Sequence, residues 1–270
     1  MTHYKNVLDH YANINTSFLH GAGIKGSKHL LSEAKLAGNE SVFELGCGTG
    51  ASLVLLKHNF PGLAISGGDL SQTMLNAARK RIRFCGLHKE VTLYKLQQNQ
   101  AIPLPDNSKD VVWIESVLAI QNDQQLDFLL KEIHRILKPG GKLIINETLW
   151  LPHVTIEQAN RLNEECQKAF GIIQANANNA RLDNWGDIIE TKGYSIDYHG
   201  CIESYSNLGP SLTSWKNNHR SRLFDFLGKT KRLVNIKYRS DHKTIIQKGE
   251  QVISSRVKVL NAYAMVARKY

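Results

Sequence analysis

The chain has 270 residues, of which 42% are hydrophobic and 21% charged, and this ordinary globular composition excludes disordered, collagen-like and disulfide-scaffold proteins. No apolar run reaches the ~18 residues of a membrane span, and the first residues lack the apolar core of a secretory signal, so we expect a cytoplasmic protein. The four cysteines, Cys47, Cys85, Cys166 and Cys201, are widely separated. This spacing is typical of reduced thiols, and we predict no metal site.

The net charge of +10 is concentrated at one end of the chain. Residues 201–270 carry 14 Lys/Arg against 4 Asp/Glu, whereas residues 1–200 carry 20 of each. A basic region of this kind favours an acidic substrate, a phosphate surface or a nucleic acid as partner. A solvated basic face on a soluble enzyme explains it equally well.

Predicted strands and helices alternate along the first half of the chain. Apolar runs and turn residues predict strands at 41–45, 63–68, 91–94, 110–114 and 142–146, helices at 28–37, 51–59, 71–85 and 123–137, and a last strand at 262–267. This alternation indicates a mostly parallel sheet with helices on both faces, in which ligands bind outside the carboxyl ends of the strands.

A glycine-rich turn follows the first predicted strand. Gly46, Gly48 and Gly50 stand between that strand and a helix, where glycine permits positive φ and a close approach of the backbone to a ligand. Gly46, Gly48 and Ala51, with Asp69 further on, also satisfy a dinucleotide fingerprint, so an NAD enzyme is an alternative function. The glycines could also serve the geometry of the turn alone. Glu44 argues against a dinucleotide, because its carboxylate would repel a diphosphate.

Four sequence blocks together resemble the class I S-adenosylmethionine-dependent methyltransferases, and in particular their small-molecule, type 11-like group. The blocks are VFELGCGTG (42–50), ISGGDLSQTML (65–75), IPLPDNSKDVV (102–112) and LKEIHRILKPGGKLII (130–145). The resemblance implies an α/β, Rossmann-like fold with a seven-stranded, mostly parallel sheet, an antiparallel last strand, helices on both faces and helical lid insertions.

The resemblance also implies a single methyltransferase domain over 1–270. We expect an N-terminal helical cap (1–40), a cofactor-binding core (41–148), a lid insertion (149–184) containing Trp150, and a C-terminal part (185–270) with a polar, irregular, basic insertion (202–258).

The resemblance assigns roles to individual residues around S-adenosylmethionine. Glu44, Gly46 and Gly48 would lie under the methionine part, and Asp69 would accept hydrogen bonds from both ribose hydroxyls. Where the family has an acid after its third strand this chain has Gln98, which leaves the adenine contact open between Gln98 and Asn99. The predicted cofactor-binding residues are Tyr11, Glu44, Gly46, Cys47, Gly48, Asp69, Leu70, Met74, Gln98, Asn99 and Glu115.

The resemblance does not identify a catalytic base. Glu115, His20 and His153 are candidates, although each histidine can equally be a surface or packing residue. The function implied is methyl transfer to a small organic molecule, at an oxygen, nitrogen or carbon atom that stays open, as does the oligomeric state. An RNA methyltransferase that uses the basic region, with Trp215 among its interleaved aromatic residues, is the first alternative. A non-catalytic partner protein with this fold is the second.

Overall fold

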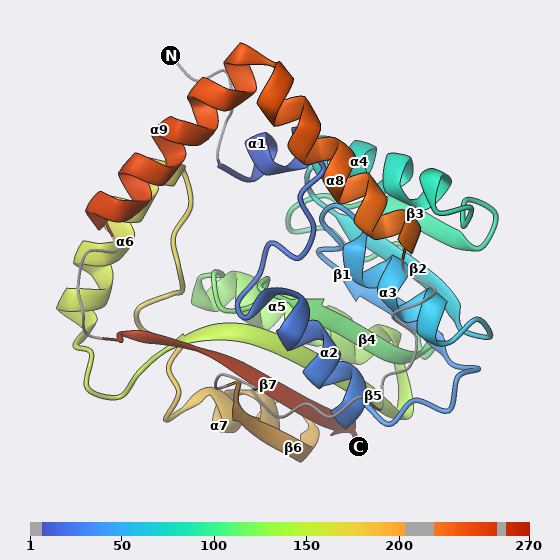
Figure 1. Ribbon diagram of the computed structural model, residues 1–270. Helices are drawn as coiled ribbons and strands as arrows, with labels where there is room; N and C mark the ends of the chain where they lie inside the picture. Colours follow the sequence, from blue (N-terminus) through green and yellow to red (C-terminus); the bar gives the residue numbers. More distant parts are fainter. Residues whose placement is uncertain (1–6, 203–218, 253–257) are drawn as a thin grey trace.

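A seven-stranded sheet forms the centre of the computed structural model, which describes residues 7–202, 219–252 and 258–270 (Figure 1). The strand order is β3-β2-β1-β4-β5-β7-β6. The strands are β1 (Ser41–Leu45), β2 (Ala64–Asp69), β3 (Val91–Lys95), β4 (Lys109–Glu115), β5 (Leu137–Trp150), β6 (Tyr194–Cys201) and β7 (Leu260–Lys269). Strands β1 to β5 pair in parallel, and β7 is antiparallel to both of its neighbours. The predicted fold class is confirmed.

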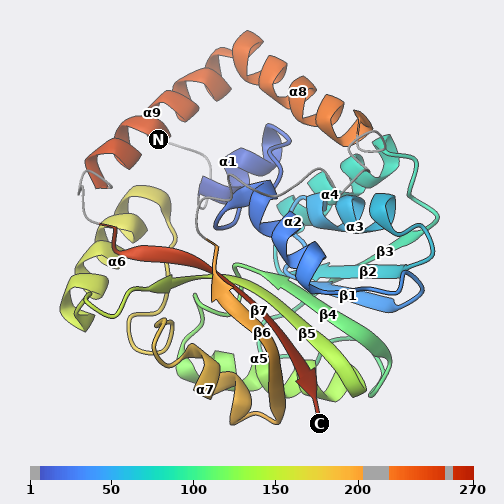
Figure 2. The same cartoon turned by 60° about the horizontal axis from the view of Figure 1, so that its bottom comes forward.

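Helices cover both faces of the sheet (Figure 2). They are α1 (Val7–Asn13), α2 (Gly23–Glu33), α3 (Ala51–Asn59), α4 (Gln72–Phe84), α5 (Asp123–Ile136), α6 (Ile156–Phe170), α7 (Trp185–Glu190), α8 (His219–Val234) and α9 (Ile236–Val252). Buried residues of α2, α3 and α4 form one core with Trp113 and Ile144, whereas α5 and α7 pack on Val112 and Ile114. Neighbouring strand residues therefore face opposite cores, as the pleat requires.

One predicted helix and one predicted strand have different bounds in the structure. The helix expected at 28–37 begins earlier, at Gly23, and ends at Glu33, because Lys35 has a positive φ of 45° that a helix cannot continue through. Strand β5 extends to Trp150, because β7 supplies a partner along its length and Trp150 pairs with Leu260.

The two expected insertions also differ from the prediction. Trp150 is fully buried in the core and its indole nitrogen donates to the carbonyl of Ala175 over 3.1 Å, so this residue is no part of a lid. Within 149–184 the only α-helix is α6, which starts with a capping box between Thr155 and Gln158. Where the structure describes 202–258, this segment is largely helical and forms α8 and α9 instead of irregular chain; 203–218, with Trp215, and 253–257 lie outside the described residues.

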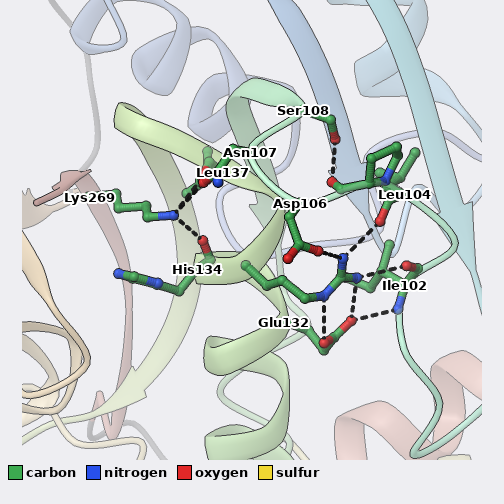
Figure 3. A network of polar contacts seen from close by, with 11 residues as sticks. Ile102, Leu104, Asp106, Asn107, Ser108, Glu132, His134, Leu137 and Lys269 are labelled. Carbon is green, nitrogen blue, oxygen red and sulfur yellow. Dashed lines mark hydrogen bonds and ion pairs between the residues drawn. The ribbon is translucent and has the colours of Figure 1, made fainter.

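Arg135, near the end of α5, fastens the loop that precedes β4 (Figure 3). Its guanidinium donates to the carbonyls of Ile102 and Leu104 and pairs with Asp106 and Glu132 at 2.7 and 2.8 Å. Glu132 in turn accepts from the Ile102 amide at 2.8 Å. The LKEIHRILKPGG block thus contains residues that hold the loop before β4 in place.

Candidate active site

A cavity of about 350 Å³ lies at the carboxyl ends of β1, β2 and β4. Its lining includes the glycine turn, the ends of these strands, the loop 97–100 and the N-terminal turn 18–20. This is the edge of a parallel sheet where ligands are expected to bind.

The three glycines of the turn have different reasons to be glycine, although all have positive φ (74°, 49° and 75°). A Cβ on Gly46 would overlap the side chain of Val117, and one on Gly50 would lie 3.1 Å from the Ala78 Cβ. A Cβ on Gly48 would meet nothing closer than 4.0 Å, and Gly48 lines the cavity. Gly46 and Gly50 therefore permit close packing, whereas Gly48 leaves room for a ligand.

Asp69 joins the glycine turn to the start of α4. Its Oδ2 accepts from the Gly48 amide at 2.8 Å and its Oδ1 from the Ser71 amide at 2.7 Å. Burial raises the pKa of this carboxyl. Two backbone donors hold both oxygens in one orientation at the cavity, and each oxygen keeps a lone pair for a ligand hydroxyl.

Glu44 is a buried acid beneath the turn. Among the described residues its Oε2 has no hydrogen-bond partner. Burial, and then repulsion from Glu115, raise the pKa of Glu44 well above its ordinary value. A neutralising cation would relieve both effects, so this position fits an ammonium group and disfavours a diphosphate.

Glu115, at the end of β4, is held by side chains from three other elements. Its Oε1 accepts from Ser52 Oγ and Trp113 Nε1, both at 2.8 Å. Its Oε2 accepts from Ser27 Oγ at 2.8 Å and Asn146 Nδ2 at 3.0 Å. Four donors converge on one buried carboxyl group, which fixes its orientation toward the cavity.

His20 meets this carboxyl group from the N-terminal turn. Its Nε2 lies 3.1 Å from Oε2 of Glu115, and its Nδ1 lies 3.1 Å from Nδ2 of Asn146. With the proton on Nε2, the ring donates to Glu115 and Nδ1 accepts from Asn146. This is the geometry of a histidine oriented by an acid at the wall of a cavity.

The structure brings most of the predicted site residues together and leaves two outside. The cavity lining contains His20, Glu44, Gly46, Cys47, Gly48, Asp69, Leu70, Met74, Gln98, Asn99 and Glu115. Tyr11 is not in the lining, because its side of α1 faces α9, where its ring meets that of His242 at 6.3 Å. His153 is exposed in the turn after β5 and is also absent from the lining.

Other site residues were missed by sequence reasoning. Trp113 and Asn146 could have been found from strand alternation. Trp113 lies two residues before Glu115 on β4, and Asn146 pairs with Glu115 on β5, so both side chains share the sheet face of Glu115. Ser27 and Ser52 give no such signal. No described residue of 149–184 lines the cavity; the N-terminal segment covers it instead, with the apolar side chains of Leu8, Phe18 and Leu19.

Comparison with known proteins agrees with this geometry. Residues 42–141 match the family model of a methyltransferase domain. The demethylmenaquinone methyltransferase of Lactobacillus johnsonii is 35% identical over 148 residues, which cover 54% of this chain and 59% of that protein. The chain thus matches less than two thirds of the length of this relative.

Solved structures share the fold over nearly the whole chain. The [4+2]-cyclase SpnF superposes with a TM-score of 0.68 at 17% identity, covering 98% of this chain and 94% of its own. A sarcosine dimethylglycine methyltransferase from Galdieria sulphuraria gives 0.63 at 16% identity, covering 92% and 86%. Residues 42–141 therefore match a methyltransferase domain, and nearly the whole chain has the fold of these solved proteins.

Proposed function

We propose that this protein transfers a methyl group from S-adenosylmethionine to a small, largely apolar organic molecule. The observation that carries the proposal is the fit between three groups and that cofactor: a buried Glu44 oxygen in need of a cation, an open surface at Gly48, and the oriented Asp69 carboxyl group. When bound, S-adenosylmethionine supplies a sulfonium-activated methyl group.

The chain's own residues would hold the cofactor at both ends. Glu44 pairs with the ammonium group of the methionine part, and Asp69 accepts from the ribose hydroxyls. Leu70 and Met74 offer apolar contacts to the adenine, and Gln98 or Asn99 offers hydrogen bonds to its edge; all four line the cavity.

The acceptor would lie against the apolar wall of the same cavity. Leu8, Phe18, Leu19, Ile120 and Phe128 contribute to this wall, which would exclude water from the reacting atoms. No Lys or Arg occurs in the lining among the described residues. This composition favours an uncharged acceptor over the acidic or phosphorylated one that the net charge suggests.

His20 and Glu115 are the acid-base pair we assign to the reaction. Methyl transfer to an oxygen or an acidic carbon requires removal of a proton from the acceptor. His20 would take that proton on Nδ1, which would then give up the hydrogen bond from Asn146. Glu115 would stabilise the imidazolium that forms, because its Oε2 lies 3.1 Å from Nε2.

Calorimetric titration with S-adenosylmethionine, its demethylated product and NADH tests the cofactor. We expect micromolar binding of the first two and none of NADH; binding of NADH alone would establish a dinucleotide enzyme instead. Transfer of a labelled methyl group to apolar phenols, quinols and ketones then tests the acceptor class, with carboxylates and phosphate esters as the opposing set. Transfer only to the opposing set would contradict an apolar acceptor.

A further inference from the structure

Helices α8 and α9 form the outermost layer of the molecule on one side (Figures 1 and 2). They meet at an apex around Asn235, from which α8 descends along α4 and α9 reaches α6. Both views show this apex standing away from the sheet. The two helices therefore present a broad outward surface.

The inner face of α8 is defined by its contacts with α4. Ser221, Phe224 and Gly228 are buried, and the Phe224 ring lies 5.4 Å from that of Phe84. Asp225, the one acid in the sequence of α8, pairs inward with the fully buried Arg81 at 2.8 Å. The opposite side of α8 consequently faces outward, without an acid of its own helix.

That opposite side is apolar along the length of the helix. Its exposed apolar residues are Leu223, Phe226, Leu227, Leu233 and Val234, which at 100° per residue fall within about 120° of one another and form one stripe, with Thr230 between Leu227 and Leu233. The stripe continues across the apex to Ile236. Exposure is greatest there, at 61% for Leu233, 81% for Val234 and 76% for Ile236.

Basic side chains border the stripe on both sides. At 100° per residue, Arg222 and Lys229 fall on one edge and Arg220 and Lys231 on the other. Lys237, Arg239 and Lys243 in the first half of α9 are also exposed. An apolar stripe between two rows of cations is the pattern of a helix that lies in the plane of a membrane surface.

We propose that the outer face of α8, together with the apex, docks onto an anionic lipid bilayer. The apolar stripe would enter the region between headgroups and acyl chains, while the flanking Lys and Arg side chains would meet anionic headgroups. RNA matches the cations but leaves the apolar residues unburied, and an apolar protein partner offers no anions to the cations. No helix among the described residues is long and apolar enough to cross a membrane, so the contact is a surface contact.

This inference does not depend on methyl transfer, and its variants spare the active site. The link between α8 and the glycine turn is on the inner face, where Arg81 donates to the Thr49 carbonyl at 3.0 Å and pairs with Asp225. Substitutions on the outer face leave these contacts in place.

Co-sedimentation of the full chain with vesicles tests the proposal. We expect binding to phosphatidylcholine vesicles that contain phosphatidylglycerol, weak binding to phosphatidylcholine alone, and a loss of binding with added salt. The double variant V234S/I236S should weaken binding roughly tenfold or more, because two apolar anchors are lost. I156S, at an isoleucine of α6 that is 49% exposed, is the control and should bind normally.

A second pair of variants tests the charges. K229Q/K231Q should weaken binding to the anionic vesicles by roughly 25-fold, about fivefold per cation, and K89Q/K168Q, at exposed lysines elsewhere, should not. Failure to bind either vesicle overturns the proposal. So does binding of single-stranded RNA in place of vesicles, or a dimer in sedimentation velocity that V234S/I236S converts to monomer.

Discussion

His20 Nε2 lies 3.1 Å from Glu115 Oε2 at the wall of the cavity, although one residue precedes α2 and the other ends β4. Ser27 of α2 holds the pair together, since its hydroxyl lies within 3.1 Å of both side chains. The contact arises because α2 packs on the sheet face onto which Glu115 projects.

Replacement of His20 by alanine should lower kcat by roughly 10² to 10⁴ if His20 removes the acceptor's proton. Affinity for S-adenosylmethionine should change little. His153→Ala provides the control, since this exposed histidine is outside the cavity lining. An unchanged kcat in His20→Ala would remove His20 from the reaction.

Gly46→Ala and Gly48→Ala should separate packing from ligand binding. Both substitutions strain a positive-φ position by about 1–2 kcal/mol, but only alanine at 46 also overlaps Val117. Gly46→Ala should therefore lower the free energy of unfolding more than Gly48→Ala, and Gly48→Ala should lose more cofactor affinity.

Chemical denaturation and calorimetric titration measure the two effects. Val117→Ala in the Gly46→Ala background should recover stability, because it removes the overlapping methyl groups. If the double variant were no more stable than Gly46→Ala, the clash would not be the cause.

Asp69→Ala should weaken binding of S-adenosylmethionine by roughly ten to a hundredfold, the loss expected for charge-assisted hydrogen bonds to two hydroxyls. Asp69→Asn keeps one acceptor oxygen and should lose less. Titration calorimetry measures both, with thermal unfolding to confirm that the link between Gly48 and Ser71 has not collapsed the turn. Wild-type affinity in Asp69→Ala would exclude this residue from the site.

Glu147 should make stability fall as the pH rises. Burial raises its pKa from 4.5 to about 7, so between these values the folded chain binds more protons than the unfolded chain. The free energy of unfolding then decreases with rising pH, by at most about 1.4 kcal/mol per pH unit from this group, and levels off above pH 7.

Glu147→Gln removes this dependence and keeps an acceptor for the amides of Val117 and Leu118, which Glu147 holds at 2.8 and 2.7 Å. In urea unfolding at pH 5 and pH 8, the free energy of unfolding of the variant relative to that of wild type should increase as the pH rises. Glu132→Gln is a poor control because Glu132 pairs with Arg135; Glu164→Gln, on the exposed side of α6, is suitable. Parallel pH curves for wild type and Glu147→Gln would show that Glu147 does not titrate in this window.

Much of the sheet and the turn could be predicted because their signals are local. Apolar runs and the glycines of the turn each act over a few residues, and parallel pairing then aligns the strand ends. Sequence order alone therefore predicts that one edge of the sheet holds Glu44, Gly48 and Asp69, which all line the cavity. The glycines of the turn have the positive φ that this type of residue permits.

Only the tertiary structure decided which distant residues meet. Leu8 and Tyr11 lie less than one helical turn apart, yet Leu8 lines the cavity while Tyr11 faces α9, because the docking of α1 sets which side is inward. The same holds for the His20–Glu115 pair and for the apolar stripe of α8. Periodicity gives the two sides of such a helix, whereas long-range packing against α4 selects the side that remains exposed.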